Sequence, residues 1–323
     1  MVDLPPPRRI PAHRNLYGYG PEPPAVGWPG GARVAVSLVL NVEEGSEQAV
    51  SRGDAVNEHV HDMVHEVRGM DDPAMESHFD YGARAGYWRI VRVLAAHGAT
   101  CTINGCAEAL EVTPWIARDA VARGFEIACH GDRWLAHGGL DEATERATIA
   151  RAVARIERAC GVRPVGWHTR CPHTLATRRL LVEEGGFTYD SDAYDDDLPS
   201  LIEVAGRPHV VLPYSLDTND MRCQRPEAAF VTAGQFAEYV IDAFETLYEE
   251  GEAVPKMMTI GLHTRTIGRP GRIAGLQRVM AHLAAKPAGT VWFARRRDIA
   301  DHWRAHAPVL PAPPGDAGSG PSS

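Results

Sequence analysis

Short apolar segments rich in β-branched residues recur along this chain, and most are followed by a longer segment with helical periodicity. The first is "ARVAVSLVLNV", and later ones include "ATCTING", "FEIACHG", "PVGWHTR", "HVVLPYS" and "KMMTIGLHTR". Helical patterns such as "GQFAEYVIDAFETLYEEG" lie between them. Regular alternation of strand and helix predicts a parallel sheet covered by helices, and seven or eight such units predict a barrel. We therefore expect an α/β barrel of about seven parallel strands.

The residues that follow the predicted strands are mostly acidic, basic or histidine, and they contain no lysine. They are Glu43, Glu44, His130, His168, Arg170, His173, Asp190, Asp192, Asp217, Asn219, Asp220, His263 and Arg265. In parallel α/β barrels the carboxyl ends of the strands meet at one face, where functional groups gather. Histidines, carboxylates and arginines facing one pocket suit hydrolysis by a general acid and a general base.

Two adjacent carboxylates, Glu43 and Glu44, stand where the first predicted strand ends. Their repulsion is costly, and it should raise the pKa of one of the two. Proteins usually accept such a pair for acid–base chemistry or for a metal.

Composition excludes several classes of function. The 323 residues are 44% apolar and carry a net charge of −9, which argues against a nucleic-acid groove or a contact with an anionic membrane surface. No apolar run approaches the roughly 18 residues of a membrane helix, and the first residues lack the apolar core of a signal peptide. Scattered cysteines without CxxC pairs indicate reduced thiols. We expect a cytoplasmic protein.

The chain shows neither an internal repeat nor a linker, so we expect one barrel domain over residues 31–306. A proline-rich arm at residues 1–30 precedes it. A low-complexity tail at residues 307–323 follows it and is predicted to be disordered.

Several segments together resemble the NodB-homology polysaccharide deacetylase superfamily, and within it the cofactor-independent bacterial allantoinases. They include "WPGGARVAVSLVLNVEEGSE", "HGDRW", "LDTNDMR", "IGLHTRTIGRPGR" and "VWFARRRDIADHW", and they span roughly Gly27 to Trp303. The resemblance implies an irregular (β/α) barrel that acts on a small cyclic amide or ureide. It also implies a homo-oligomer, either a dimer or a tetramer.

The resemblance assigns roles to individual residues. Glu43 and Glu44 stand where the deacetylases carry an Asp–Asp pair of base and metal ligand, so Glu43 is expected to be the general base. His130 matches the first histidine of the H-x-x-x-H metal motif, but Trp134 stands at the second position, and tryptophan cannot coordinate a metal. His263 matches the histidine that donates a proton to the leaving nitrogen.

Two alternatives remain open around this centre. The first is that Glu44 only bonds His130 as scaffold while Glu43 acts alone. The second concerns the cofactor: the resemblance implies none, but one divalent metal such as Zn could be held by Glu44 and His130. His168, His173 and His137 could complete such a site with a different geometry.

Other matched residues are expected to serve orientation and substrate binding. Arg170 belongs to the R-x-P motif, whose arginine orients the base or stabilises an oxyanion. The aspartates of "DSDAYDDD" and "LDTND" either orient His263 or cap loops. Expected substrate-binding residues are Trp134, His168, His173, Asp192, Asp217, Arg265 and Arg269.

The segment "GWHTRCPHTLATRR" differs from the "GWYTGR" stretch of the allantoinases that the chain resembles. A changed loop at the mouth of a pocket alters substrate contacts while leaving a hydrolytic centre intact. The first expectation is ring opening of allantoin to allantoate, in purine catabolism. The alternatives are a cyclic imide hydrolase acting on a hydantoin- or succinimide-like ring, a metal-dependent N-deacetylase, and a non-catalytic binding protein.

Overall fold

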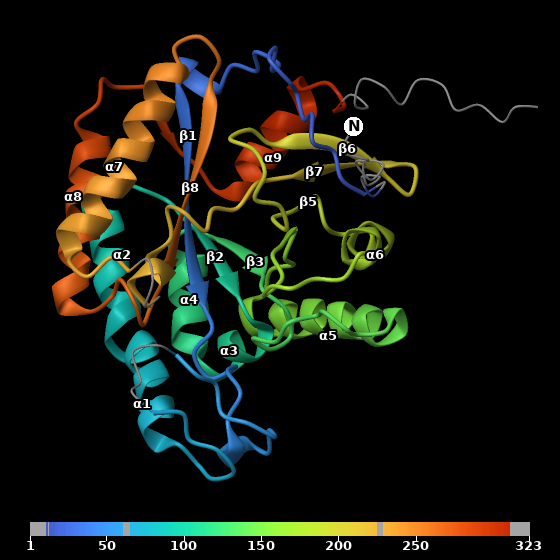
Figure 1. Ribbon diagram of the computed structural model, residues 1–323, viewed down its shortest axis with the longest axis vertical. Helices are drawn as coiled ribbons and strands as arrows, with labels where there is room; N and C mark the ends of the chain where they lie inside the picture. Colours follow the sequence, from blue (N-terminus) through green and yellow to red (C-terminus); the bar gives the residue numbers. More distant parts are fainter. Residues whose placement is uncertain (1–10, 12, 61–64, 225–228, 311–323) are drawn as a thin grey trace, which may run out of the picture.

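The computed structural model describes residues 11, 13–60, 65–224 and 229–310. Its described strands form one curled sheet in the order β6-β7-β5-β4-β3-β2-β1-β8, with β9 also paired to β1 (Figure 1). The strands are β1 (Val34–Val42), β2 (Thr102–Gly105), β3 (Glu126–Cys129), β4 (Gly166–Trp167), β5 (Tyr189–Asp190), β6 (Ser200–Val204), β7 (Arg207–Val211), β8 (Lys256–His263) and β9 (Val291–Phe293).

Strand β1 is a long, buried strand that pairs with three other strands of the sheet. All nine of its residues are buried, as expected for a strand of a parallel sheet that is covered on both faces. It pairs with β2, β8 and β9, and its register with β8 runs from Val34 opposite Lys256 to Asn41 opposite His263. This register places the residues just after β1 beside those just after β8.

Helices pack against both sides of the sheet. Figure 1 shows α7 and α8 on one side of β1 and β8, with α5 and α6 on the other. The helices are α1 (Pro73–Tyr81), α2 (Tyr87–Ala96), α3 (Ala107–Val112), α4 (Pro114–Ala122), α5 (Glu142–Cys160), α6 (Thr177–Glu184), α7 (Ala233–Glu250), α8 (Pro270–Ala284) and α9 (Arg296–His306). Short helical turns are η1 (Pro29–Gly31), η2 (Val50–Arg52), η3 (Gly82–Gly86) and η4 (Asp220–Gln224).

The predicted α/β barrel is confirmed as a half-barrel of mostly parallel strands, with one difference from the expected pattern. Strands β6 and β7 form an antiparallel hairpin at one end of the sheet order. The two residues between them, Ala205 and Gly206, both have positive φ, 51° and 72°. Positive φ at both turn positions is typical of tight hairpin turns, which reverse the chain and so produce antiparallel pairing.

The described segments before β1 and after α9 pack against the body of the domain. Trp28 is buried beside Trp292 and Trp303, and the Tyr19 hydroxyl donates to the backbone of Pro199. Within the predicted tail, the Leu310 amide donates to the Leu201 carbonyl. Residues 1–10, 12 and 311–323 of the predicted arm and tail lie outside the described residues, so the proposed domain limits stay a prediction.

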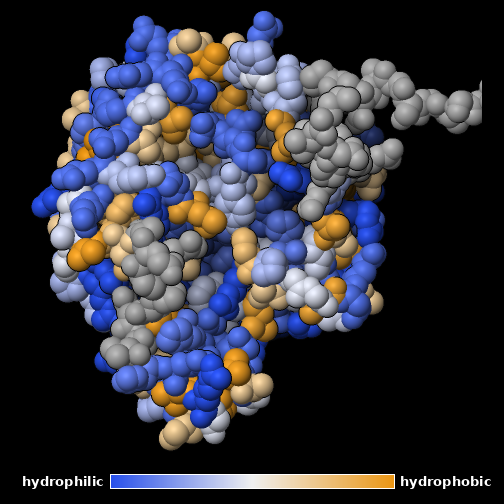
Figure 2. Space-filling view, viewed as in Figure 1, coloured by the Kyte–Doolittle hydropathy of each residue, from blue (hydrophilic) through white to orange (hydrophobic). Residues whose placement is uncertain are grey.

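None of the helices in the described part of the chain is long and apolar enough to cross a membrane. On the face drawn in Figure 2, apolar residues lie scattered among polar ones rather than in one broad patch. This face therefore gives no clear signal of a subunit interface.

Arg296, at the start of α9, lies fully buried inside the half-barrel. Its guanidinium donates to the Leu212 and Pro213 carbonyls at 2.6 and 3.1 Å and to the hydroxyls of Ser191 and Thr259 at 2.9 and 3.0 Å. A buried charge is tolerated only when its donors are satisfied. This side chain therefore connects the segments after β5 and β7 to β8.

Replacing Arg296 should destabilise the fold. We expect Arg296→Met to lower the free energy of unfolding by about 3 kcal/mol or more, because two carbonyls and two hydroxyls lose a buried partner. Urea denaturation measures the change. The neighbouring exposed Arg297 provides the matched control, and Arg297→Met should stay within about 0.5 kcal/mol of the unsubstituted protein. Equal stabilities of the two variants would contradict this role of Arg296.

Candidate active site

Four strands deliver the central residues to one edge of the sheet. Glu43 follows β1 directly, His130 follows β3, His168 follows β4, and His263 is the last residue of β8. The carboxyl ends of neighbouring parallel strands meet at one edge, so these side chains converge. They line a cavity of about 490 Å³ together with Trp134 and Arg170, among other residues.

The Glu43 carboxylate lies at the centre of this cavity and is fully buried. Its Oε1 atom lies 3.4 Å from Nε2 of His130 and 3.6 Å from Nε2 of His263, without a hydrogen-bond partner among the described residues. Its Oε2 atom accepts a 2.6 Å bond from Nη1 of Arg265. Burial raises the pKa of Glu43, but Arg265 and the two histidines outweigh it and hold this pKa well below its usual range. Glu43 is therefore ionised, with one oxygen free to accept a proton.

The Glu44 carboxylate is buried and does not line the cavity. Its Oε2 accepts the Glu43 amide at 3.2 Å, and its Oε1 accepts the Thr264 hydroxyl. Burial raises the pKa of Glu44, and the neighbouring Glu43 charge adds to the rise. The raised pKa of Glu44 agrees in direction with the prediction for the pair, but burial rather than repulsion by Glu43 is its main cause. In the described contacts Nε2 of His130 faces Glu43, so the alternative in which Glu44 bonds His130 is not what the structure shows.

His263 is held by a carboxylate behind it. Its Nδ1 lies 2.6 Å from Oδ1 of Asp220, whose Oδ2 accepts the His263 amide at 2.7 Å. Asn219 bridges to Gly261 of β8, and this bridge places η4, with Asp220 at its start, alongside the end of the strand. Burial lowers the pKa of His263, but the Asp220 and Glu43 charges outweigh it and raise this pKa above its ordinary value. His263 is thus prepared to carry the proton that a leaving group needs.

His130 is oriented by the segment after β4. Its Nδ1 lies 2.6 Å from the His168 carbonyl, which accepts a hydrogen bond from it and so directs Nε2 at Glu43. The His130 ring stacks on the His168 ring, with centroids 5.1 Å apart and planes 3° apart. Nδ1 of His168 lies 3.2 Å from Asp192, which also accepts the Thr169 amide and hydroxyl. Asp192 therefore holds the loop after β4 in place and does not itself line the cavity, contrary to the expectation that it binds substrate.

Arg265 does not reach the cavity, contrary to the expectation that it binds substrate. Its side chain is fully buried, with the guanidinium 4.4 Å from the Phe79 ring centroid and 4.8 Å from that of Trp134. Arg265 does not line the cavity, and its Nη1 lies 2.6 Å from Glu43 and 3.6 Å from Glu44. Arg265 is therefore the arginine that orients the expected base.

Arg170 was expected to orient the base or stabilise an oxyanion. It lines the cavity, but its two Nη atoms donate to the Glu58 carboxylate, each at 2.8 Å. Nη1 also donates to the Trp134 carbonyl at 2.7 Å, and the guanidinium lies 3.8 Å from the Trp134 ring centroid. Its bonds thus fix the mouth of the cavity rather than Glu43.

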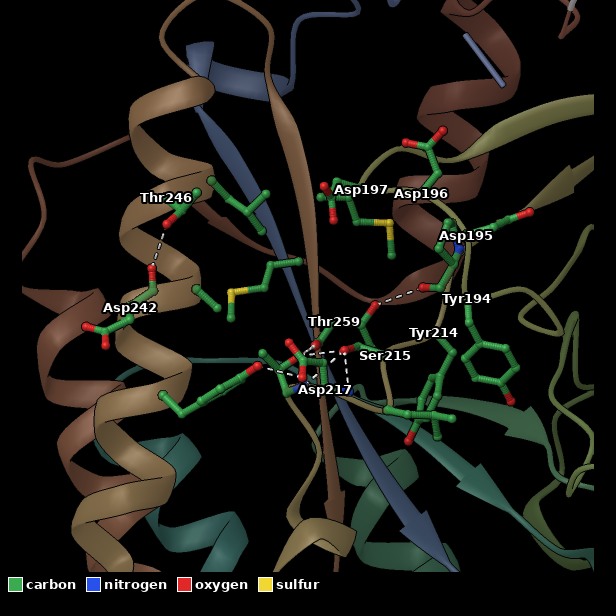
Figure 3. A pocket seen from close by; sticks show the side chains of 18 residues that line it. Tyr194, Asp195, Asp196, Asp197, Tyr214, Ser215, Asp217, Asp242, Thr246 and Thr259 are labelled. Atoms are coloured by element: carbon green, nitrogen blue, oxygen red, sulfur yellow. Dashed lines mark hydrogen bonds between the residues drawn. The ribbon is translucent and has the colours of Figure 1, made fainter. Parts of the chain in front are cut away.

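Besides Asp192 and Arg265, three further expected substrate-binding residues lie away from this cavity. His173 is exposed and outside the lining, and Arg269 lies over the Tyr81 ring while donating to the Arg265 carbonyl. Asp217 lines a second cavity of about 770 Å³ (Figure 3), where it accepts a 2.7 Å bond from Tyr239. The folded loops, rather than the strand ends, direct these three side chains elsewhere.

Several site residues escaped the sequence-based selection. Asp220 was expected only as one of the "LDTND" aspartates that either orient His263 or cap loops, and its contact with Nδ1 of His263 confirms the first alternative for this residue, although Asp217 was selected as the site residue of that segment. Asn41 donates to the Tyr214 hydroxyl at 3.0 Å and to the Leu262 carbonyl at 3.1 Å. The sequence feature that could have identified Asn41 is its position as the single asparagine in the apolar run of β1. Glu58 lies in a segment without periodicity, so no pattern pointed to it.

The described residues do not fit a metal site. No three His, Cys, Asp or Glu side chains among them lie close enough together to hold an ion. Trp134 occupies the position of the missing ligand, and Glu44 bonds Thr264. Of the extra histidines, His137 lies 3.0 Å from Glu145.

Comparisons with known proteins agree with this architecture. The polysaccharide deacetylase family model matches residues 68–189. A Schizosaccharomyces pombe protein described as a polysaccharide deacetylase is 35% identical over 317 residues, covering 91% of this chain and 98% of its own. The chain therefore belongs to the polysaccharide deacetylase family, and this family and the buried acid–base centre together indicate a hydrolase.

Two solved structures are similar over nearly their whole length. A polysaccharide deacetylase from Pseudomonas aeruginosa PAO1 is 44% identical, with a TM-score of 0.87 and coverage of 92% of this chain and 99% of that one. The Puue allantoinase is 45% identical, also with a TM-score of 0.87, and the alignment covers 93% and 99% of the two chains. This likeness supports the predicted resemblance to the allantoinases.

The contact between Asp220 and His263 predicts a change that needs no substrate to measure. We expect Asp220→Asn to lower the pKa of His263, because the negative charge beside Nδ1 disappears. Titration of the histidine ring signals by NMR measures it. Asp217→Asn, which makes the same chemical change in the second cavity, should leave His263 unchanged. An unaltered pKa in Asp220→Asn would show that this carboxylate does not set it.

Proposed function

We propose that this protein is a hydrolase that opens a cyclic amide or ureide ring with a water molecule activated by Glu43. The observation that supports this most directly is the Oε1 atom of Glu43, which accepts no hydrogen bond from the described residues and lies 3.4 and 3.6 Å from Nε2 of His130 and of His263. An ionised carboxylate with one unpaired oxygen in a cavity suits a general base.

The proposed reaction follows from this arrangement. Glu43 takes a proton from water, and the oxygen attacks the ring carbonyl. Nε2 of His130 lies beside the same carboxylate oxygen; with both ring nitrogens protonated, its N–H would help hold the water or the oxyanion that forms. Protonated His263 then donates its proton to the ring nitrogen as the C–N bond breaks. The proton on Glu43 can return to His263, because their atoms lie 3.6 Å apart.

We further propose that catalysis proceeds without a metal. Trp134 at the second position of the metal motif supports this proposal, as does the poor fit of the described residues to a three-ligand site. Arg265 supplies the positive charge beside the base, with its Nη1 atom 2.6 Å from Glu43.

Allantoin, converted to allantoate in purine catabolism, is the first substrate that we propose. The 45% identity to the Puue allantoinase supports it. A cyclic imide such as a hydantoin or succinimide is the second, because the altered segment "GWHTRCPHTLATRR" contributes His168, Thr169, Arg170 and Cys171 to the cavity. The family match alone would also allow a metal-dependent N-deacetylase, and Trp134 leaves a non-catalytic binding protein as the remaining alternative. A cytoplasmic location and a homo-oligomeric assembly stay predictions.

Removing the proposed base should abolish turnover. We expect Glu43→Gln to lower kcat about 10³-fold or more, because general-base catalysis contributes 10²- to 10⁴-fold and the amide cannot accept a proton. Thermal melting is the control for folding. Activity like that of the unsubstituted protein would disprove the role of Glu43.

Substrate and cofactor can be tested together by assaying protein treated with a chelator. We expect ring opening of racemic allantoin to persist after this treatment. Turnover of hydantoin or succinimide alone would keep the mechanism and replace the substrate. Activity that returns only with an added divalent metal would contradict the metal-free proposal, and inactivity in both states would favour a binding protein.

A further inference from the structure

The cavity holds a single guanidinium. Among the described residues that line it, Arg170 is the only arginine or lysine, and the lining also contains the carboxylates of Glu43 and Glu58. A substrate that carries a carboxylate on its ring would need a cation to offset the loss of hydration on binding. Arg170 is the cation placed to provide that compensation.

Glu58 already occupies Arg170. The two carboxylate oxygens accept from the two Nη atoms at 2.8 Å each, and this is the bidentate geometry in which arginine recognises carboxylates. The Glu58 side chain is 8% exposed, whereas that of Arg170 is 27% exposed. The glutamate therefore fills the buried side of the guanidinium fork.

Arg170 would keep its place without Glu58. Nη1 also donates to the Trp134 carbonyl at 2.7 Å, and the guanidinium lies 3.8 Å from the Trp134 ring centroid. Arg170 also does not bond Glu43, the proposed base, because Arg265 is the arginine that donates to that carboxylate. Its fork would thus be available to a ligand if the internal carboxylate were removed.

We propose that Glu58 is a specificity-determining residue that stands in for a substrate carboxylate, so that the cavity selects uncharged cyclic amides and rejects rings bearing a carboxylate. This deepens the proposed function by defining the charge class of the substrate, and it rests on that function for the identity of the ring. Ligand selection itself is measurable by binding, without turnover.

Hydantoin-5-acetamide and hydantoin-5-acetate form a matched pair of probes, since they are nearly equal in size and differ by one negative charge. Calorimetry on the unsubstituted protein should show tighter binding of the acetamide by about tenfold or more, as expected when one charge lacks a partner. Equal affinities, tighter binding of the acetate, or binding of neither probe would overturn the proposal.

The Glu58→Gln variant tests the residue itself. It should bind the acetate about tenfold or more tightly than the unsubstituted protein does, with the acetamide affinity changed less than threefold. The control Glu66→Gln removes the same charge from an exposed residue paired with Arg68 and should leave both affinities unchanged. In the double variant Glu58→Gln/Arg170→Gln the gain should disappear. No gain in Glu58→Gln that melts normally, or a gain that persists in the double variant, would overturn the proposal.

Turnover separates this inference from the proposed function. If no cyclic amide is hydrolysed but the binding preference changes as described, the proposed reaction is wrong and the role of Glu58 stands. If rings are opened but Glu58→Gln leaves the preference unchanged, the reaction stands and the role of Glu58 is wrong.

Discussion

The salt bridge between Glu43 and Arg265 is the interaction on which the site depends. An ionised carboxylate that is fully buried pays a large desolvation cost unless a cation lies against it. The register of β1 with β8 provides that cation, because it places the residue two positions after His263 beside the carboxylate that follows β1. With Oε2 held in this way, Oε1 faces Nε2 of His130 and of His263.

This salt bridge also divides the roles of the paired glutamates and of the two arginines. Glu43 bonds Arg265 and stays ionised, while Glu44 bonds a hydroxyl and has a raised pKa. Two adjacent carboxylates are tolerable because Nη1 of Arg265 lies near both, 2.6 Å from Glu43 and 3.6 Å from Glu44, and because the raised pKa of Glu44 favours its neutral form. Because Arg265 neutralises the base, Arg170 can serve the cavity mouth with Glu58.

The acid side of the site is built on the same principle. The Asp220 carboxylate lies beside Nδ1 of His263 and raises the pKa of that ring, whereas the Arg265 guanidinium lies beside Glu43 and lowers the pKa of that carboxyl. A protonated histidine and an ionised carboxylate are the forms that the proposed hydrolysis needs. Oε1 of Glu43 and Nε2 of His263 thus lie 3.6 Å apart with opposite preferences for the proton. Trp134 stands beside this pair in the cavity lining, at the position where the family motif has a histidine.

Local patterns in the chain predict the α/β architecture and the residues that end its strands, among them Glu43, His130 and His263. An apolar run encodes a buried strand, the polar residue after it marks the strand end, and parallel strands bring such ends together. Three pairings, in contrast, became visible in the folded protein: Arg265 with Glu43, Asp220 rather than Asp217 with His263, and Glu58 with Arg170. Glu58 and Arg170 lie 112 residues apart. Such partners are chosen by strand register and by the paths of irregular loops, and neither leaves a periodic trace in the chain.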